Sequence, residues 1–164
     1  MVKIALLSDT HGYLDERFIK HFLACDEIWH AGDIGTTSLA DQLAMMKPLR
    51  AVHGNIDGQP LRLQFPADQR FNLEDVSVWI RHIGGYPGHY EKEIRDILRI
   101  NPPRLLITGH SHILKIQYDK HYELLYINPG AAGRYGFHTL QTLVKFKLHT
   151  GNITDMEVVE LNRS

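Results

Sequence analysis

The fold and the site both depend on one stretch, Leu105-Leu106-Ile107-Thr108-Gly109-His110-Ser111-His112. It is an apolar run, which predicts a buried strand, followed by Thr-Gly and two imidazoles. In extended backbone, residues two apart point to the same side, so we expect His110 and His112 to face one cavity. Taken alone, the pair is more typical of surface histidines at a strand end. A ligand site here therefore requires partners from elsewhere in the chain.

Four more predicted strands run directly into polar residues in the same way. They cover residues 4–7, 27–31, 49–52 and 76–80. The polar residues that follow them are Asp9, His11, Asp33, Asn55 and His82. Helices predicted over 14–24 and 37–46 alternate with the first three strands, which indicates a parallel sheet with crossover helices. In such sheets the ligand crevice lies outside the carboxyl ends of the strands, so these side chains are expected to converge.

The remaining segments predict a single α/β domain over residues 1–164 with mixed sheets. Thr37 or Ser38 is expected to cap the second helix. Residues 59–70 are expected to be irregular, because Pro60 and Pro66 would interrupt a ladder. Other expected elements are a strand at 71–73, a helix at 89–100, hairpins at 113–127 and 142–161, and a loop containing Gly133 and Gly136. Trp29, Trp79 and Cys25 are expected in the core.

Composition excludes several classes of protein. The chain has 164 residues, of which 43% are hydrophobic and 23% charged, as in ordinary globular proteins. Its net charge of −1 gives no field that would attract nucleic acid or an anionic membrane. The single cysteine excludes an intrachain disulfide and a thiolate zinc site. The sequence shows neither a signal peptide nor a membrane-spanning stretch, so a cytoplasmic location is expected.

The candidate ligands have a chemistry of their own. Imidazole, carboxylate and amide donors without thiolate suit a transition metal of borderline character. Seven donors are too many for one tetrahedral ion, and they suit two ions that share a carboxylate. Two divalent ions and two aspartates leave a net charge of about +2, which would attract an anion such as a phosphate ester. Glycines at 12, 32, 54 and 109 adjoin these donors and permit close backbone approach.

Together these motifs resemble the calcineurin-like metallophosphoesterase superfamily, and most of all its small bacterial and archaeal phosphodiesterases. The resemblance rests on residues 8–12, 30–33, 52–57, 82, 109–112 and 128–130. It implies a four-layer α-β-β-α sandwich of two mixed sheets flanked by helices, with a dinuclear metal site at the carboxyl ends of the strands. The first ion would be held by Asp9, His11, Asp33 and His112, and the second by Asp33, Asn55, His82 and His110. These seven residues would also be the catalytic residues.

The implied function is a metal-dependent phosphoesterase, which hydrolyses phosphodiester bonds by attack of a hydroxide that bridges two divalent ions. Manganese is the expected metal, with iron, nickel and zinc as alternatives. The substrate would be a small phosphoester, contacted by Arg134 and His89. Many relatives have a histidine where this chain has Ile56, so the identity of any general acid is left open. The native substrate, the native metal and the oligomeric state are also left open.

An alternative function belongs to another class. A eukaryotic trafficking subunit resembles the same group and binds protein partners, so a catalytically weak or inactive scaffold is the second hypothesis. The complete ligand set favours the enzyme. Among the neighbouring residues, His30 and His53 are expected to pack or hydrogen-bond rather than bind metal. For Asp57, an orienting role and a solvated turn stay open.

Overall fold

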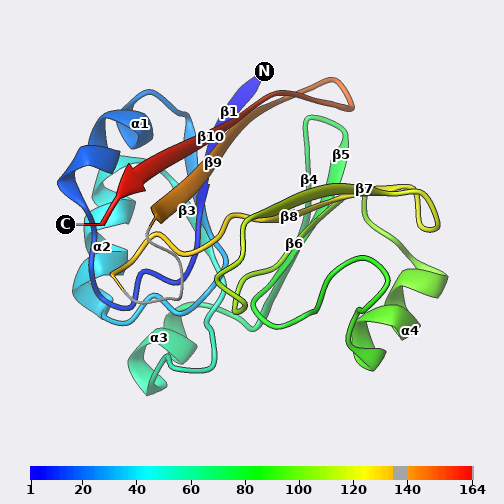
Figure 1. Cartoon of the computed structure of the whole chain (residues 1–164), viewed down its shortest axis with the longest axis horizontal. Coiled ribbons are helices and arrows are strands. Elements are labelled where there is room, and N and C mark those ends of the chain that lie inside the picture. Colours follow the sequence, from blue (N-terminus) through cyan, green and yellow to red (C-terminus); the bar gives the residue numbers. More distant parts are fainter. Residues whose placement is uncertain (135–139, 164) are drawn as a thin grey trace.

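The structure, a computed structural model, describes residues 1–134 and 140–163. Its strands form two five-stranded sheets, ordered β10-β9-β1-β2-β3 and β4-β5-β6-β8-β7 (Figure 1). The first sheet contains β1 (Val2–Leu7), β2 (Glu27–His30), β3 (Leu49–Ala51), β9 (Leu140–His149) and β10 (Asn152–Asn162). The second contains β4 (Asp68–Leu73), β5 (Val76–Arg81), β6 (Leu105–Ile107), β7 (Lys115–Asp119) and β8 (Leu124–Asn128). Gly136, expected in a loop, lies outside the described residues.

Both sheets are mixed, as the sequence predicts. In the first sheet β1, β2 and β3 are parallel, while β9 runs antiparallel to β1 and β10 antiparallel to β9. In the second sheet β5, β6 and β8 are parallel, and the edge strands β4 and β7 are antiparallel to their neighbours. Each sheet therefore has a parallel centre, and its hairpins add the antiparallel strands.

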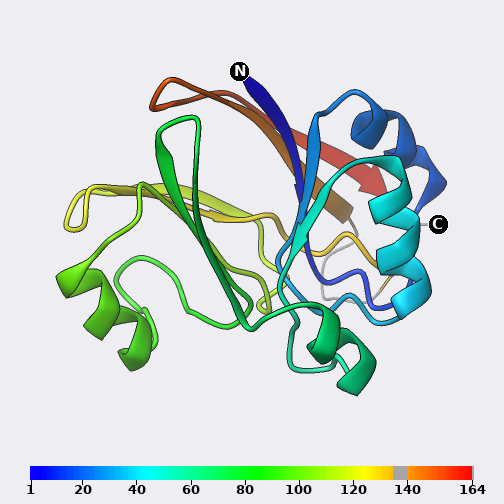
Figure 2. The same ribbon diagram turned by 180° about the vertical axis from the view of Figure 1, so that it is seen from behind.

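Helices cover the outer faces of both sheets. In the described residues they are α1 (Ile19–Leu23), α2 (Thr37–Met46), α3 (Gln59–Gln64) and α4 (Lys92–Ile100), with a short 3-10 turn, η1 (Glu16–Phe18), before α1. α1 and α2 pack on the first sheet and α4 on the second, as the two opposite views show (Figure 1, Figure 2). The expected four-layer sandwich is confirmed.

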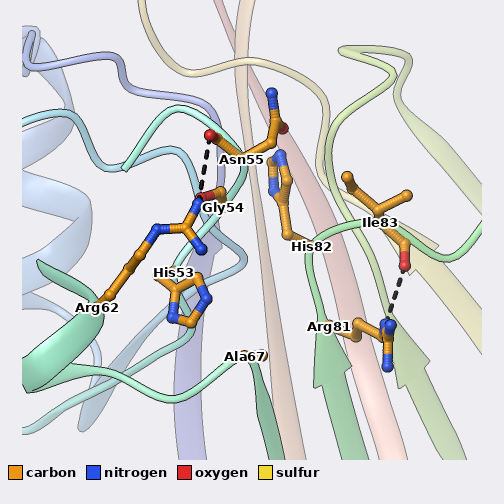
Figure 3. Close-up of a pocket in the computed structure, with 8 residues that line it drawn as sticks. All are labelled: His53, Gly54, Asn55, Arg62, Ala67, Arg81, His82 and Ile83. Atoms are coloured by element: carbon orange, nitrogen blue, oxygen red, sulfur yellow. Dashed lines mark hydrogen bonds between the residues drawn. The ribbon is translucent and has the colours of Figure 1, made fainter. Parts of the chain in front are cut away.

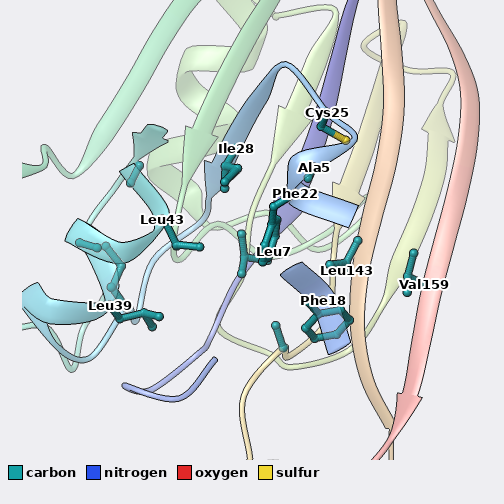
Figure 4. Close-up of a cluster of buried hydrophobic side chains, with 14 of the residues drawn as sticks. Ala5, Leu7, Phe18, Phe22, Cys25, Ile28, Leu39, Leu43, Leu143 and Val159 are labelled. Atoms are coloured by element: carbon teal, nitrogen blue, oxygen red, sulfur yellow. The ribbon is translucent and has the colours of Figure 1, made fainter. Parts of the chain in front are cut away.

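Strand alternation divides the core into layers. In β1, Ala5 and Leu7 face the helices, whereas Ile4 and Leu6 face the second sheet. The helix-side layer adds side chains from η1, α1 and α2, as Figure 4 shows: Phe18, Phe22, Leu39 and Leu43. Trp29 lies between the sheets and Trp79 lies under α4, both at most 1% exposed. Cys25 is buried in the helix-side layer, and burial raises the pKa of its thiol, so its expected role as a small core residue is confirmed.

The prediction that residues 59–70 are irregular is wrong. Residues 59–64 form α3 and β4 begins at Asp68. Pro60 lies in the first turn of α3, where the N–H that proline lacks would have no partner within the helix. Pro66 falls between the helix and the strand, so neither proline interrupts a ladder.

Three helix boundaries also differ from expectation. Asp15 caps the first helix, which begins as η1 rather than at residue 14, because its carboxylate accepts from the backbone N–H of Arg17 at 2.9 Å. Thr36, not Thr37 or Ser38, caps α2, because its hydroxyl accepts from the Leu39 N–H at 3.1 Å. The helix expected from residue 89 begins at 92, after a turn. No helix among the described residues is long and apolar enough to cross a membrane.

Candidate metal centre

The loops at the carboxyl ends of β1, β2, β5 and β6 bring the candidate ligands into two adjacent groups. Asp9, His11 and His112 form one group. Asp33, His82 and His110 form the other. Within each group, one potential ligand atom from each residue lies within 4.8 Å of the others. Three ligands that follow strands of the first sheet therefore meet three histidines that follow strands of the second sheet, at one edge of the sandwich.

The two carboxylates join the groups. Asp33 Oδ2 lies 3.2 Å from His82 Nε2 and 3.5 Å from His11 Nε2, so it faces both groups at once. Asp9 Oδ1 lies 3.3 Å from His112 Nε2 and 3.8 Å from His82 Nε2. A carboxylate between two clusters of imidazoles is the arrangement that a shared metal ligand requires.

Asn55 completes the set on the solvent side. Its Oδ1 lies 3.1 Å from His110 Nδ1, which places both atoms beside the second group. Asn55 and His110 are exposed, while Asp9, Asp33 and His82 are each at most 3% exposed. The charged carboxylates thus form the floor of the site, and its mouth is lined by neutral donors.

The backbone at the ligands is unusual. Positive φ values occur at Asp9 (55°), His11 (48°), Asp33 (57°), His110 (72°) and His112 (64°). Such conformations are uncommon for residues with a side chain, and they cluster at functional sites. The expectation that His110 and His112 lie in extended backbone is therefore wrong. The two rings lie in different ligand groups, which matches the division between two ions that the resemblance implies.

Hydrogen bonds aim the ligand atoms at the centre. His82 Nδ1–H donates to the Ala31 carbonyl at 2.7 Å, which leaves the Nε2 lone pair pointing into the site. Asp9 Oδ2 accepts from Ser8 Oγ at 2.8 Å, leaving Oδ1 for the centre. Asp33 Oδ1 accepts from the Ile56 N–H at 3.0 Å, leaving Oδ2. These three ligands are therefore each oriented by a residue that is not itself a ligand.

Two buried atoms test whether these residues fit a metal ion. Asp9 Oδ1 and His82 Nε2 have no hydrogen-bond partner within the described part of the chain. Buried polar atoms are nearly always satisfied, and one cation in each ligand group would satisfy both atoms. The donor set, oxygen and imidazole nitrogen without sulfur, suits manganese, iron, nickel or zinc. The residues fit two divalent ions.

The electrostatics are those of a cation site. Burial alone would raise the pKa of Asp9, but the attraction of His11, His112 and His82 outweighs it and lowers that pKa. Burial would likewise raise the pKa of Asp33, and His82 outweighs it. The same contacts raise the pKa of His82 against the opposing effect of burial. Both carboxylates are thus ionised at neutral pH and available to bind cations.

Two glycines permit this close packing. A Cβ at Gly54 would lie 2.1 Å from Asp33 Oδ1, and a Cβ at Gly32 would lie 2.5 Å from His82 Nδ1. Gly32 also has a φ of +102°, which L side chains rarely adopt. Both positions therefore require glycine so that the backbone can reach the ligands.

Neighbouring polar residues support the loops. Asp57, which the sequence left open, is 3% exposed and accepts from the N–H groups of Ile34, Gly35 and Gly54 at 2.8 to 3.1 Å. It therefore orients the backbone beside Asp33 and Asn55. Sequence reasoning missed its burial, because a carboxylate in a Gly-rich turn looks the same whether it is solvated or enclosed.

Two histidines beside the motifs are held by other contacts. His30 is buried, its Nδ1 accepts from the Gly32 N–H at 3.1 Å, and its Nε2 lies 3.0 Å from Thr10 Oγ1. Both ring nitrogens are used, so the prediction of a hydrogen-bonded role is confirmed. His53 Nδ1–H donates to the Phe65 carbonyl at 2.8 Å.

The two residues expected to bind substrate, Arg134 and His89, each contact an aromatic ring. The Arg134 guanidinium stacks 3.9 Å above the Tyr13 ring, and the His89 ring lies 4.9 Å from that of Tyr86. Ile56, where many relatives have a histidine, is 47% exposed and supplies only its backbone N–H to Asp33. A pocket of about 240 Å³ opens beside the site and shares Asn55 and His82 with it (Figure 3).

A model of the calcineurin-like phosphoesterase superfamily domain matches residues 2–151. The chain belongs to this superfamily. A probable metallophosphoesterase of Mycoplasma pneumoniae is 31% identical, over 95% of this chain and 96% of that protein. A second, from Methanothermobacter thermautotrophicus, is 26% identical over 78% of this chain and 76% of its own length.

Solved structures share the superfamily fold along nearly the whole chain. An archaeal phosphodiesterase has a TM-score of 0.77 at 20% identity, covering 97% of this chain and 99% of its own. Vps29 from Entamoeba histolytica, solved with Zn²⁺, has a TM-score of 0.75 at 14% identity, covering 99% of both chains. At these identities the likeness shows the fold, and the assignment to the superfamily rests on the sequence matches.

Proposed function

We propose that the protein is a metal-dependent phosphodiesterase that works with two divalent ions, with manganese as the native metal. One observation carries the proposal: Asp33 Oδ2 lies within 3.5 Å of an imidazole from each ligand group, so one carboxylate serves both. Membership of the superfamily supports phosphoester hydrolysis as the class of reaction.

The chain's own residues divide the work. Asp9 and Asp33 offset the charge of the cations from the buried floor, and Asn55 and His110 complete the ligand set at the exposed mouth, where a substrate enters. Two divalent ions bound there would supply Lewis-acid stabilisation of the phosphoryl oxygens and would lower the pKa of a bound water to about 7. The donors are held in place before substrate arrives, so little reorganisation is needed.

The residue at position 56 narrows the substrate class. Ile56 offers no proton to a departing alkoxide, and its side chain is 47% exposed. Substrates whose leaving group is already a weak base, such as aryl phosphodiesters, therefore suit the site best. We expect slower hydrolysis of alkyl esters.

Ligand variants test the proposal. Asn55→Ala and His82→Ala should each lower turnover of bis(p-nitrophenyl) phosphate by at least about 100-fold, because each removes a donor from the second group. His121→Ala, an exposed histidine outside the site, is the matched control. The assay compares manganese, nickel, zinc and magnesium, and diester with monoester. Unchanged turnover in the two ligand variants would refute the proposal.

The alternative function is a scaffold for protein partners. It predicts that the purified protein binds metal but turns over no phosphoester with any of the four metals. Fold likeness to Vps29 does not distinguish the two functions, because the likeness to the archaeal phosphodiesterase is just as strong. The metal panel therefore decides between them.

A further inference from the structure

The pocket beside Asn55 and His82 is lined by basic side chains (Figure 3). Arg62 and His53 lie on one side of it, and Arg81, His82 and Ile83 lie on the other. Its lining contains two arginines and two histidines and no carboxylate. The pocket adjoins the metal centre, because the candidate ligands Asn55 and His82 form part of its wall. A molecule bound at the metal centre would therefore be able to extend into the pocket.

The two arginines differ in how their charge is used. Arg81 Nη2 lies 2.9 Å from Glu93 Oε2, and its Nη1 lies 3.4 Å from both carboxylate oxygens of Asp68. Its charge is therefore already paired. Arg62 has no carboxylate oxygen within 4.0 Å of its guanidinium in the described residues. Arg62 is thus the cation in this pocket that can pair with a ligand.

Arg62 is also fixed in place. Its Nε donates to the Asp57 carbonyl at 2.6 Å, and its Nη2 donates to the carbonyls of Gly54 and Asn55 at 3.3 and 3.4 Å. These bonds tie the guanidinium to the loop that carries the ligand Asn55, and none of them uses Nη1. A cation held in this way loses little entropy when it binds an anion.

We propose that this pocket binds a second phosphoryl group of the substrate, through Arg62, while the first occupies the metal centre. The inference rests on the proposed function and names its substrate class: phosphoesters that carry two phosphoryl groups. His53 lies in the same lining, but its Nδ1–H is donated to the Phe65 carbonyl, so in the neutral ring Nε2 can only accept a hydrogen bond. The Arg62 guanidinium is therefore the group in this lining that we expect to donate to phosphate oxygens.

A binding experiment that needs no turnover tests this. Calorimetry measures the affinity of the manganese-loaded protein for methylphosphonate, methylenediphosphonate and propane-1,3-bisphosphonate. The wild type should bind one of the two bisphosphonates more tightly than methylphosphonate. The bisphosphonate that binds more tightly shows whether the two phosphoryl groups of the substrate are adjacent or separated by a spacer. Arg62→Gln should reduce that preference by roughly 10-fold or more, the effect of losing a charge-assisted hydrogen bond. Arg62→Lys should reduce it less.

The controls separate the possible causes. Arg99→Gln makes the same charge change on α4, away from the pocket, and should keep the wild-type preference. If the wild type shows no preference, the inference fails. If Arg62→Gln lowers the affinity for all three ligands by the same factor, Arg62 only holds the Asn55 loop in place, and the inference fails as well. Each ligand binds free manganese equally well in every experiment, so this contribution cancels when the variants are compared with the wild type. Turnover of bis(p-nitrophenyl) phosphate tests the proposed function separately.

Discussion

Gly54→Ala should damage the metal centre through one added methyl group. The new Cβ would lie 2.1 Å from Asp33 Oδ1 and 2.4 Å from the Asp33 backbone nitrogen. Ordinary contact begins at 3.4 Å, so the Asp33 carboxylate must retreat by more than about 1 Å. That movement breaks the 3.0 Å bond from Ile56 and withdraws Oδ2 from His82 and His11.

The size of the effect follows from this displacement. Overpacking of this kind costs about 1–3 kcal/mol of unfolding free energy, which lowers the melting temperature by roughly 2–12 °C in a chain of this length. A misplacement of about 1 Å costs about 100-fold in turnover. Metal content by mass spectrometry should fall as well, since Asp33 serves both ligand groups.

Gly58→Ala is the matched control. Gly58 lies four positions further along the same loop, and a Cβ there meets only Pro60 Cδ, at 3.9 Å. Neither glycine has a left-handed φ, so backbone strain does not separate the two variants. If Gly54→Ala matched Gly58→Ala in melting temperature, metal content and turnover, the steric reasoning would be wrong.

Two further predictions concern the histidines. His110→Ala and His112→Ala should each lower the bound metal from two ions toward one, because the two rings belong to different ligand groups; loss of both ions or of neither from a single variant would contradict this. Burial lowers the pKa of His30 to about 4, below its unfolded value of about 6.5. The stability that depends on neutral His30 is therefore complete above pH 6.5 and is lost as the pH falls toward 4, by up to about 3 kcal/mol. In metal-free protein, urea unfolding at pH 7.5 and 4.5 should show a smaller loss for His30→Gln than for the wild type, and equal losses would count against this account.

Periodicity was enough to predict an α/β domain with mixed sheets, whereas the four-layer arrangement was expected only from the resemblance. In β1, Ile4 and Leu6 alternate with Ala5 and Leu7 between two core layers, so residues 4–7 form a continuous apolar run. The same reasoning failed for residues 59–70. Proline was weighed there as a strand breaker, although it also starts helices, and α3 was missed together with Arg62.

The backbone of the site was beyond sequence reasoning for a different reason. The pairing of His110 with His112 was expected from extended geometry, but both residues have positive φ and diverge. A left-handed conformation at a histidine costs energy locally and persists only when surrounding contacts fix it. Those contacts, such as the bond from Gly109 N–H to the His82 carbonyl at 2.9 Å, join segments far apart in the chain. Local sequence patterns therefore cannot predict these contacts.

The origin of the ligands shows how the fold and the site depend on each other. All three oxygen donors, Asp9, Asp33 and Asn55, follow strands of the first sheet. His82, like the two histidines after β6, follows a strand of the second sheet. The closest contacts between carboxylate and imidazole, Asp33 to His82 at 3.2 Å and Asp9 to His112 at 3.3 Å, therefore cross from one sheet to the other. Because no single sheet carries a complete ligand set, the centre forms only when the two sheets pack, and bound cations would in turn stabilise that packing.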